Sequence, residues 1–152
     1  MPKSNQRSLG NLWPIAVPDT NGPRCSQHLF DPYSLTHVLH GVIFAWITYG
    51  IYFLIVGNHA ENSEMVGFPL LFCIGLEVGW EVYENSEAVI SQFRSGEGSK
   101  DYHGDSYLNS FGDVLSMAVG YILTVLTPTW VGVVYLLLSE FFLAWFCRDG
   151  LF

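Results

Sequence analysis

The chain has 152 residues, of which 50% are hydrophobic and 16% aromatic, whereas only 13% are charged. This composition is too apolar for an ordinary multidomain soluble protein and indicates one membrane domain. Six Lys and Arg against 14 Asp and Glu give a net charge of -8, which argues against a nucleic-acid partner because clustered cations are needed to neutralise phosphates. The three cysteines are widely spaced and suggest neither a disulfide framework nor a Cys-x-x-Cys metal site.

Residues 1–31 form a polar N-terminal arm that is rich in Pro, Gly and Asn and lacks helical periodicity. We expect an irregular segment that does not cross the membrane. Its prolines interrupt any apolar stretch, which is unlike a cleavable signal, so we expect the arm to remain on the mature chain. Residues 32–152 are expected to form the transmembrane domain.

Four apolar runs follow the arm, each long enough to cross a bilayer of ~30 Å. Asp31 is the expected N-cap of the first helix, with Pro32 at its first position. The stretches "GVIFAWITYGIYFLIV" and "WVGVVYLLL" carry no charged face, which a helix of a soluble bundle would show. The sequence predicts an all-α fold, a four-transmembrane-helix bundle. The expected helices cover residues 32–56, 65–90, 105–126 and 128 to about 147.

Four crossings place both termini and the long loop between the second and third helices on one side. All of the Lys and Arg residues lie on that side: Lys3, Arg7, Arg24, Arg94, Lys100 and Arg148. By the positive-inside rule, we expect both termini and this loop in the cytoplasm.

Three of the predicted helices each carry a single polar seam. Such seams should face one another, because an ionised carboxylate facing hydrocarbon costs at least several kcal/mol. All three lie toward the loop end of the bundle, so we expect one polar pocket, open at that end and closed by apolar packing at the other. The seams are His37 and His40; Glu77, Glu81, Glu84 and the flanking Asn85; and Asp105, Asn109 and Asp113.

Two histidines among several carboxylates match the ligands of a divalent ion such as Zn, Mn or Fe. The predicted ligands are His37, His40, Glu81 and Glu84. Asp113 is the predicted proton carrier because it lies two turns inside its helix, where capping is not available. Asp105 is assigned a catalytic role with it. As alternatives, the histidines hydrogen-bond the glutamates, and Asp105 caps the third helix.

Other polar residues and three glycines have expected structural uses. Glycines at 41, 79 and 112 should permit close approach of helices. Glu140 is expected to pair with Arg148, two turns further on. The polar residues expected to tie helices together are Asn85, Asn109, Glu77, Glu140 and Arg148.

The segments "SQHLFDPYSLTHVLHG", "WEVYENSEAVI" and "GDSYLNSFGDVLSMAVGY" occur in this order and resemble a family of small bacterial integral-membrane proteins of unknown function, distantly similar to VanZ-like proteins. The resemblance covers residues 26 to about 121 and implies the bacterial inner membrane. The family pattern also has an upstream hydrophobic segment and a Cys-containing motif, where this chain has its short arm. An added span would reverse the side on which the site opens. The motif positions are His37, His40, Glu81, Glu84, Asn85, Ser86, Gly104, Asp105, Asn109, Gly112 and Asp113.

The residues leave three functions open. The first is a metal-assisted hydrolase or transferase that acts on a membrane lipid or another amphiphile. The second is a non-catalytic subunit or assembly factor of a larger membrane complex, which would hold the polar arm in place. The third is a cation or proton carrier, since intramembrane carboxylates and histidines also serve as relays.

Overall fold

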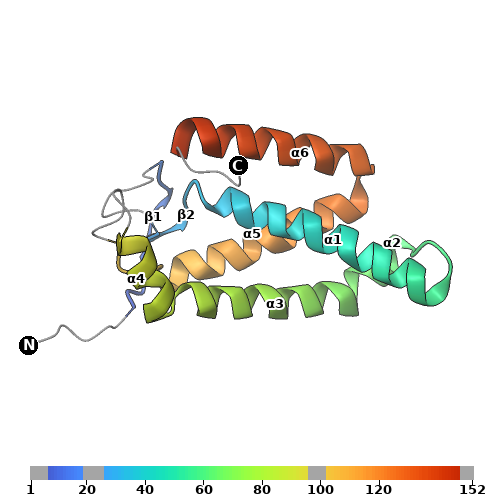
Figure 1. Cartoon of the computed structure of the whole chain (residues 1–152), viewed down its shortest axis with the longest axis horizontal. Coiled ribbons are helices and arrows are strands. Elements are labelled where there is room, and N and C mark those ends of the chain that lie inside the picture. Colours follow the sequence, from blue (N-terminus) through green and yellow to red (C-terminus); the bar gives the residue numbers. More distant parts are fainter. Residues whose placement is uncertain (1–6, 19–25, 96–101, 148–152) are drawn as a thin grey trace, which may run out of the picture.

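The computed structural model describes residues 7–18, 26–95 and 102–147. Helices dominate this part of the chain, and a small two-stranded sheet lies near its N-terminal end (Figure 1). The predicted all-α class is confirmed for the bundle. The elements are β1 (Asn11–Ala16), β2 (His28–Phe30), α1 (Ser34–Val56), α2 (Asn62–Val66), α3 (Phe68–Glu84), α4 (Glu87–Ser95), α5 (Tyr107–Leu126), α6 (Thr129–Phe142) and a π-helical turn, η1 (Leu143–Cys147).

Within the described residues, four helical segments are long and apolar enough to cross a membrane. Large apolar side chains on their outer faces, such as Leu54, Leu71 and Leu137, are more than half exposed. Such faces suit a hydrocarbon surrounding, in which apolar side chains need no further cover. The segments are Ser34–Val56, Asn62–Glu84 (α2 with α3), Tyr107–Leu126 and Thr129–Phe146.

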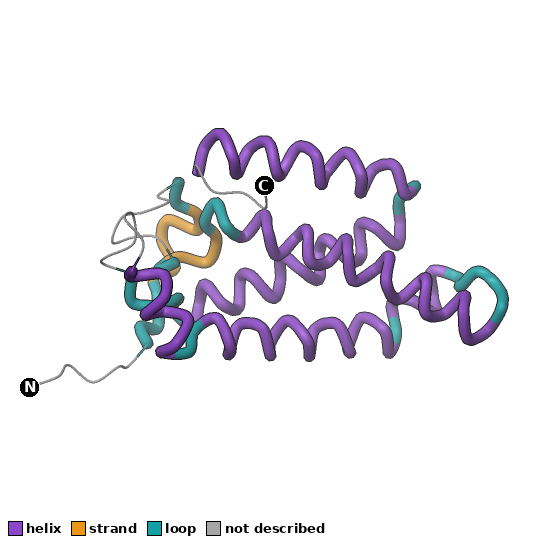
Figure 2. Tube along the Cα trace, viewed as in Figure 1, coloured by secondary structure: helices purple, strands orange, loops and turns teal. Residues whose placement is uncertain are grey.

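The bundle has two different ends. β1, β2 and α4 gather at one end, and the loop that joins α1 to α2 lies at the other (Figures 1 and 2). α1 packs most extensively on α5. The helix connections therefore place residues from the start of α1, the end of α3 and the start of α5 at the end that carries the sheet.

Glycines allow α1 and α5 to approach until their backbones touch. A Cβ atom at Gly41 would overlap the Met117 carbonyl oxygen, and one at Gly120 would overlap the Val38 carbonyl oxygen. Gly112 makes the same kind of contact with the backbone of Leu29. Among the three glycines singled out by sequence, close approach of two helices is thus confirmed for Gly41, whereas Gly112 lets α5 approach the strand β2.

The third of these glycines behaves differently. Nothing in the described structure lies within 4 Å of a Cβ built at Gly79. The prediction of a helix contact there is wrong, because this position of α3 faces outward.

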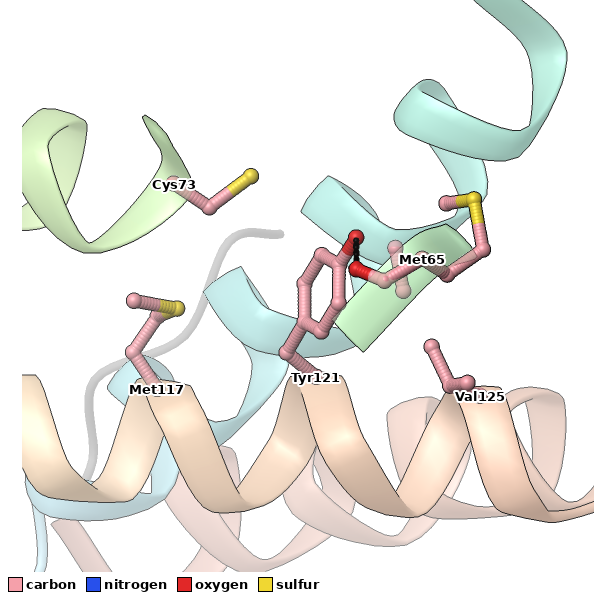
Figure 3. Packing of buried hydrophobic residues seen from close by; sticks show 6 residues of the cluster. Met65, Cys73, Met117, Tyr121 and Val125 are labelled. Carbon is pink, nitrogen blue, oxygen red and sulfur yellow. Dashed lines mark hydrogen bonds between the residues drawn. The ribbon is translucent and has the colours of Figure 1, made fainter. Parts of the chain in front are cut away.

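A hydrophobic core fills the half of the bundle away from the sheet (Figure 3). The Tyr121 hydroxyl donates to the Met65 carbonyl oxygen at 3.1 Å and lies 3.0 Å from Thr48 Oγ1. This bond joins the end of α2 to α5, so it satisfies the one polar atom of a fully buried ring. The cluster consists of Ala45, Met65, Cys73, Met117, Tyr121 and Val125.

The second predicted helix, residues 65–90, is interrupted in the structure. α3 ends at Glu84, and α4 begins separately at Glu87. The Asn85 side-chain amide donates to the Glu81 carbonyl oxygen at 2.9 Å and to Asp105 Oδ2 at 2.9 Å. An Asn that bonds to the preceding turn and to a distant residue offers the backbone an alternative to a continuing helix.

The arm is more regular than its sequence predicts. β1 and β2 pair in parallel, with Asn11 opposite His28. The N–H groups of Tyr107 and Leu108, at the start of α5, donate to the carbonyl oxygens of Ser8 and Leu9 at 3.0 and 3.3 Å. Because the first N–H groups of a helix have no partner within it, the arm is held in place by completing α5.

Prediction for the α1–α5 contact. Replacing Gly41 or Gly120 by alanine should lower the free energy of unfolding by ~1–3 kcal/mol, because the new methyl group overlaps the backbone of the facing helix. Thermal unfolding of the purified protein in detergent measures the change. Gly79→Ala is the matched control and should be neutral or slightly stabilising, since alanine favours a helix over glycine. Equal melting temperatures for Gly41→Ala and Gly79→Ala would contradict the contact.

Candidate functional site

The three polar seams converge at the sheet end of the bundle, as the sequence predicts. α1 contributes His37 and His40, α3 contributes Glu77 and Glu81, and α5 contributes Asp113. Four of these side chains are at most 7% exposed, whereas the side chain of His40 is 30% exposed. The cluster is therefore shielded from its surroundings except at one histidine.

Direct hydrogen bonds join the first part of the cluster. The Nδ1 atom of His37 lies 2.6 Å from Glu77 Oε1, and the Nδ1 atom of His40 lies 3.0 Å from the same oxygen. One carboxylate thus holds both rings. The sequence assigned Glu77 only the tying of helices, although it lies on the same helical stripe as Glu81, a signal that could have placed it with the histidines.

The second part of the cluster is more widely spaced. His37 Nδ1 lies 3.6 Å from Glu81 Oε1, and His37 Nε2 lies 4.0 Å from Asp113 Oδ2. These separations are too long for hydrogen bonds. The 4.0 Å between His37 Nε2 and Asp113 Oδ2 is compatible with a shared ion, because two ligands ~2.1 Å from one ion are at most ~4.2 Å apart. The 3.6 Å separation involves the other ring nitrogen, Nδ1, which faces Glu77. One potential ligand atom from each of the three residues lies within 4.8 Å of the others.

Glu81 is the member of the cluster whose carboxylate makes no normal hydrogen bond. Both of its carboxylate oxygens are buried and, among the described residues, neither accepts a hydrogen bond within normal distance. The Ser110 hydroxyl and His37 are its polar neighbours. A buried carboxylate without hydrogen bonds is costly, so Glu81 is the least stabilised acidic side chain of the cluster.

Asp113 is oriented from the start of α1. The Ser34 hydroxyl donates to Asp113 Oδ1 at 2.7 Å and accepts from the Asp31 N–H at 3.2 Å. The carboxylate of Asp31 accepts from the N–H groups of Tyr33 and Ser34. The predicted N-cap at Asp31 is nevertheless wrong, because α1 begins at Ser34 and its N-cap is Tyr33. Burial, together with the charge of Asp105, raises the pKa of Asp31. The surroundings of Asp113 are therefore rich in acidic side chains.

Asp105 is held apart from this cluster. Its N–H donates to Asn85 Oδ1 at 2.7 Å, and its carboxylate accepts from Asn85 Nδ2 and from the Tyr102 hydroxyl at 2.9 Å each. The alternative that Asp105 caps the third helix is wrong, because Ser106 is the N-cap and accepts from the Asn109 N–H. These bonds fasten the end of α3 to the start of α5.

The remaining predicted site residues lie around the cluster. Asn109 donates to the His28 carbonyl oxygen at 3.0 Å, which ties α5 to β2. Glu84 is partly exposed at the end of α3, and Glu140 is partly exposed on α6. Arg148 lies outside the described residues. The ligand and catalytic roles assigned from the sequence stay predictions.

Arg7 is a site neighbour that sequence reasoning did not identify. Its guanidinium donates to the Asp105 carbonyl oxygen at 3.0 Å and to the Ser110 hydroxyl, and it lies 4.6 Å from the centroid of the Tyr107 ring. A single cation far from α5 in sequence carries no local signal for this contact. The described arm therefore covers the start of α5, at the end where the sequence predicted the opening of the pocket.

The fold and the cluster define a class of small helical proteins with four apolar spans around a buried His/carboxylate site. Residues 9–152 match the family model described as "Protein of unknown function (DUF2585)", and the chain belongs to this family of bacterial proteins. This result confirms the resemblance to an uncharacterised family.

Relatives with the family designation UPF0314 occur in several bacteria. The chain is 34% identical to the UPF0314 protein of Agrobacterium fabrum, 35% to that of Paracoccus denitrificans and 37% to that of Sinorhizobium fredii. These alignments cover 88%, 88% and 92% of this chain. The chain spans only 63%, 64% and 65% of the lengths of these relatives. No solved structure matches the chain.

Prediction for the α3–α5 fastening. Asn85→Ala removes both bonds between Asn85 and Asp105 and should lower the free energy of unfolding by ~1–3 kcal/mol. It should also speed hydrogen exchange at residues 102–110, measured by mass spectrometry in detergent. Asn62→Ala is the control, because the Asn62 amide accepts one exposed bond from Tyr49. Unchanged exchange in Asn85→Ala would show that other contacts fix the start of α5.

Proposed function

We propose that the chain is an integral membrane protein that binds one divalent metal ion where α1, α3 and α5 meet. The observation that carries the proposal is the buried Glu81 carboxylate, which lacks a hydrogen bond in the described structure and lies in one group of potential ligands with His37 and Asp113. A divalent ion would compensate carboxylates that otherwise lie buried in low dielectric.

We assign His37 Nε2, Glu81 and Asp113 as the ligands, because these residues form one group of potential ligands and His37 Nδ1 is already bonded to Glu77. Glu77 then accepts the Nδ1–H of His37 at 2.6 Å, an arrangement that orients a ligating imidazole and selects its tautomer. This assignment moves His40 and Glu84 out of the ligand set predicted from the sequence. A nitrogen and two carboxylate oxygens suit Zn, Mn or Fe.

The activity that we propose is hydrolysis or group transfer on a membrane lipid or another amphiphile. Three protein ligands leave a coordination position in which the ion would activate water at neutral pH. Other residues of the chain hold the ligands in position and exclude water. Ser34 fixes one Asp113 oxygen by donating at 2.7 Å, and Glu77 holds His37 and His40 together. The burial of the cluster excludes bulk water from the reacting centre.

We place the protein in the bacterial inner membrane with both termini in the cytoplasm. The distribution of Lys and Arg supports this orientation. Among the described cations, Arg7 lies in the arm and Arg94 on α4, and these segments share the sheet end of the bundle (Figure 1). The site would then lie near the cytoplasmic face.

The two alternative functions have less support. The arm is held by its own bundle through the start of α5, so its order does not require the partner that an assembly factor would supply. A cation or proton carrier needs a polar route beyond the site. Met65, Met117 and Tyr121 pack tightly in that half of the bundle, which favours the enzyme.

Prediction for the metal site. Purified protein incubated with Zn²⁺ or Mn²⁺ and then desalted should retain about one ion, because the two groups of potential ligands in the cluster share His37. Elemental mass spectrometry should find the ion lost in Glu81→Gln and Asp113→Asn. Glu77→Gln should bind the ion ~10–100-fold more weakly. Glu64→Gln is the control, since Glu64 is exposed on α2 at the other end.

Glu84→Gln separates the two ligand assignments. Retention of the ion in this variant is expected here, whereas its loss would support the ligand set predicted from the sequence. Equally low metal in the wild type, Glu81→Gln and Asp113→Asn would refute a metal site.

Prediction for the activity. Wild-type protein in vesicles of bacterial lipid extract should convert a lipid into a product that mass spectrometry detects. Asp113→Asn should slow this conversion by about 100-fold or more, because it removes a proposed ligand. A chelator should have the same effect on the wild type, and added Zn²⁺ or Mn²⁺ should restore turnover. Product formation that persists in Asp113→Asn would refute the proposed role of the site.

A further inference from the structure

His40 is the point at which the buried cluster reaches the surface of the protein. Its side chain is 30% exposed, while those of Glu77 and His37, which it contacts, are 0% and 7% exposed. The ring of His40 meets Trp80 edge-on at a centroid distance of 5.8 Å and lies 6.1 Å from Phe44. The exposed side of the site therefore lies between α1 and α3.

The described structure covers the site from the sheet end. Arg7 spans the start of α5, and Asn85 is bonded to Asp105 in both directions. By contrast, the surface of α3 beside Trp80 is apolar, with Leu76 exposed one turn before it. A ligand that approaches His40 along this surface comes from the bilayer, so it must have an apolar tail.

The charges around the exposed side select the head group of such a ligand. Glu84 is partly exposed and lies outside the proposed ligand set, so the proposed ion does not bind its carboxylate. An anionic head group would be repelled, whereas a cationic one would be attracted.

The aromatic side chains next to Glu84 match a cationic head group as well. Trp80 and Tyr83 are exposed, and their ring centroids are 5.7 Å apart. The Trp80 side chain also lies beside the Glu84 carboxylate. Aromatic faces next to a carboxylate are the surroundings in which proteins bind ammonium groups.

We propose that His40, Trp80, Tyr83 and Glu84 form an ammonium-binding edge, which receives the head group of a membrane amphiphile laterally between α1 and α3. This inference rests on the proposed function and names the substrate class of the same site. The amine or quaternary ammonium of a zwitterionic head group binds at this edge. The remainder of the head group then extends toward His37 and the proposed metal ligands.

Native mass spectrometry tests the edge with defined lipids. Protein in dodecyl maltoside is incubated with phosphatidylethanolamine or with phosphatidylglycerol of the same acyl chains, and bound lipid is counted. The wild type should retain the zwitterionic lipid about fivefold better. Trp80→Leu and Glu84→Gln should each abolish this preference. Trp145→Leu is the matched control, because Trp145 is 78% exposed on η1.

Three outcomes would overturn the proposal. These are equal retention of the two lipids by the wild type, equal effects of Trp80→Leu and Trp145→Leu, and displacement of the lipid by free choline at the same concentration. Displacement by choline would show a site for a soluble ammonium compound. Melting temperatures exclude misfolding, and the retained preference in a second variant, Trp80→Phe, is expected because an aromatic face remains.

Metal content, measured in the same samples, keeps the two proposals distinguishable. Trp80→Leu should keep its ion and lose only the lipid preference. A wild type that lacks an ion but prefers the zwitterionic lipid would refute the metal site and leave the ammonium-binding edge supported.

Discussion

The contact on which the rest of the structure depends is the backbone approach of α1 to α5. Gly41 and Gly120 leave no room for a side chain where the two helices cross. Lipid tails are as apolar as leucine, so helices in a membrane associate through close packing more than through hydrophobic burial. The position of this crossing also determines which side chains of α1 and α5 meet nearer the sheet end of the bundle. It brings the imidazole of His37 to 4.0 Å from Asp113 and the Ser34 hydroxyl to 2.7 Å from the same carboxylate.

The buried acidic groups are stabilised to different degrees, and this difference points to function. Glu77 is bonded to two histidines, and Asp113 accepts from a serine hydroxyl. Glu81 receives no comparable bond from the described residues. A fold selected for stability alone would be better served by an apolar or amide side chain there, because a buried carboxylate without hydrogen bonds is costly. The proposed ion would offset this cost.

The N-terminal arm connects the fold to the direction from which the site is approached. Carbonyl oxygens of Ser8 and Leu9 complete the first turn of α5, and Arg7 lies across Asp105 and Ser110. The same bonds that order the arm cover the sheet end of the site. The exposed side chain of His40 therefore lies between α1 and α3 and not at the sheet end. For this reason the substrate proposed here is an amphiphile from the bilayer and not a solute from the cytoplasm.

The sequence by itself determined the apolar spans, the all-α class and the faces that carry His37, Glu81 and Asp113, because span length and helical periodicity are local properties. Tertiary structure decided that Glu77, and not Glu84, meets the histidines. All three glutamates share one stripe, and only the height of α3 relative to α1 distinguishes them. It also decided the break at Asn85, whose partner Asp105 lies 20 residues away, and the strand pairing of the arm. Such choices depend on contacts between distant segments, which no local pattern of residues encodes.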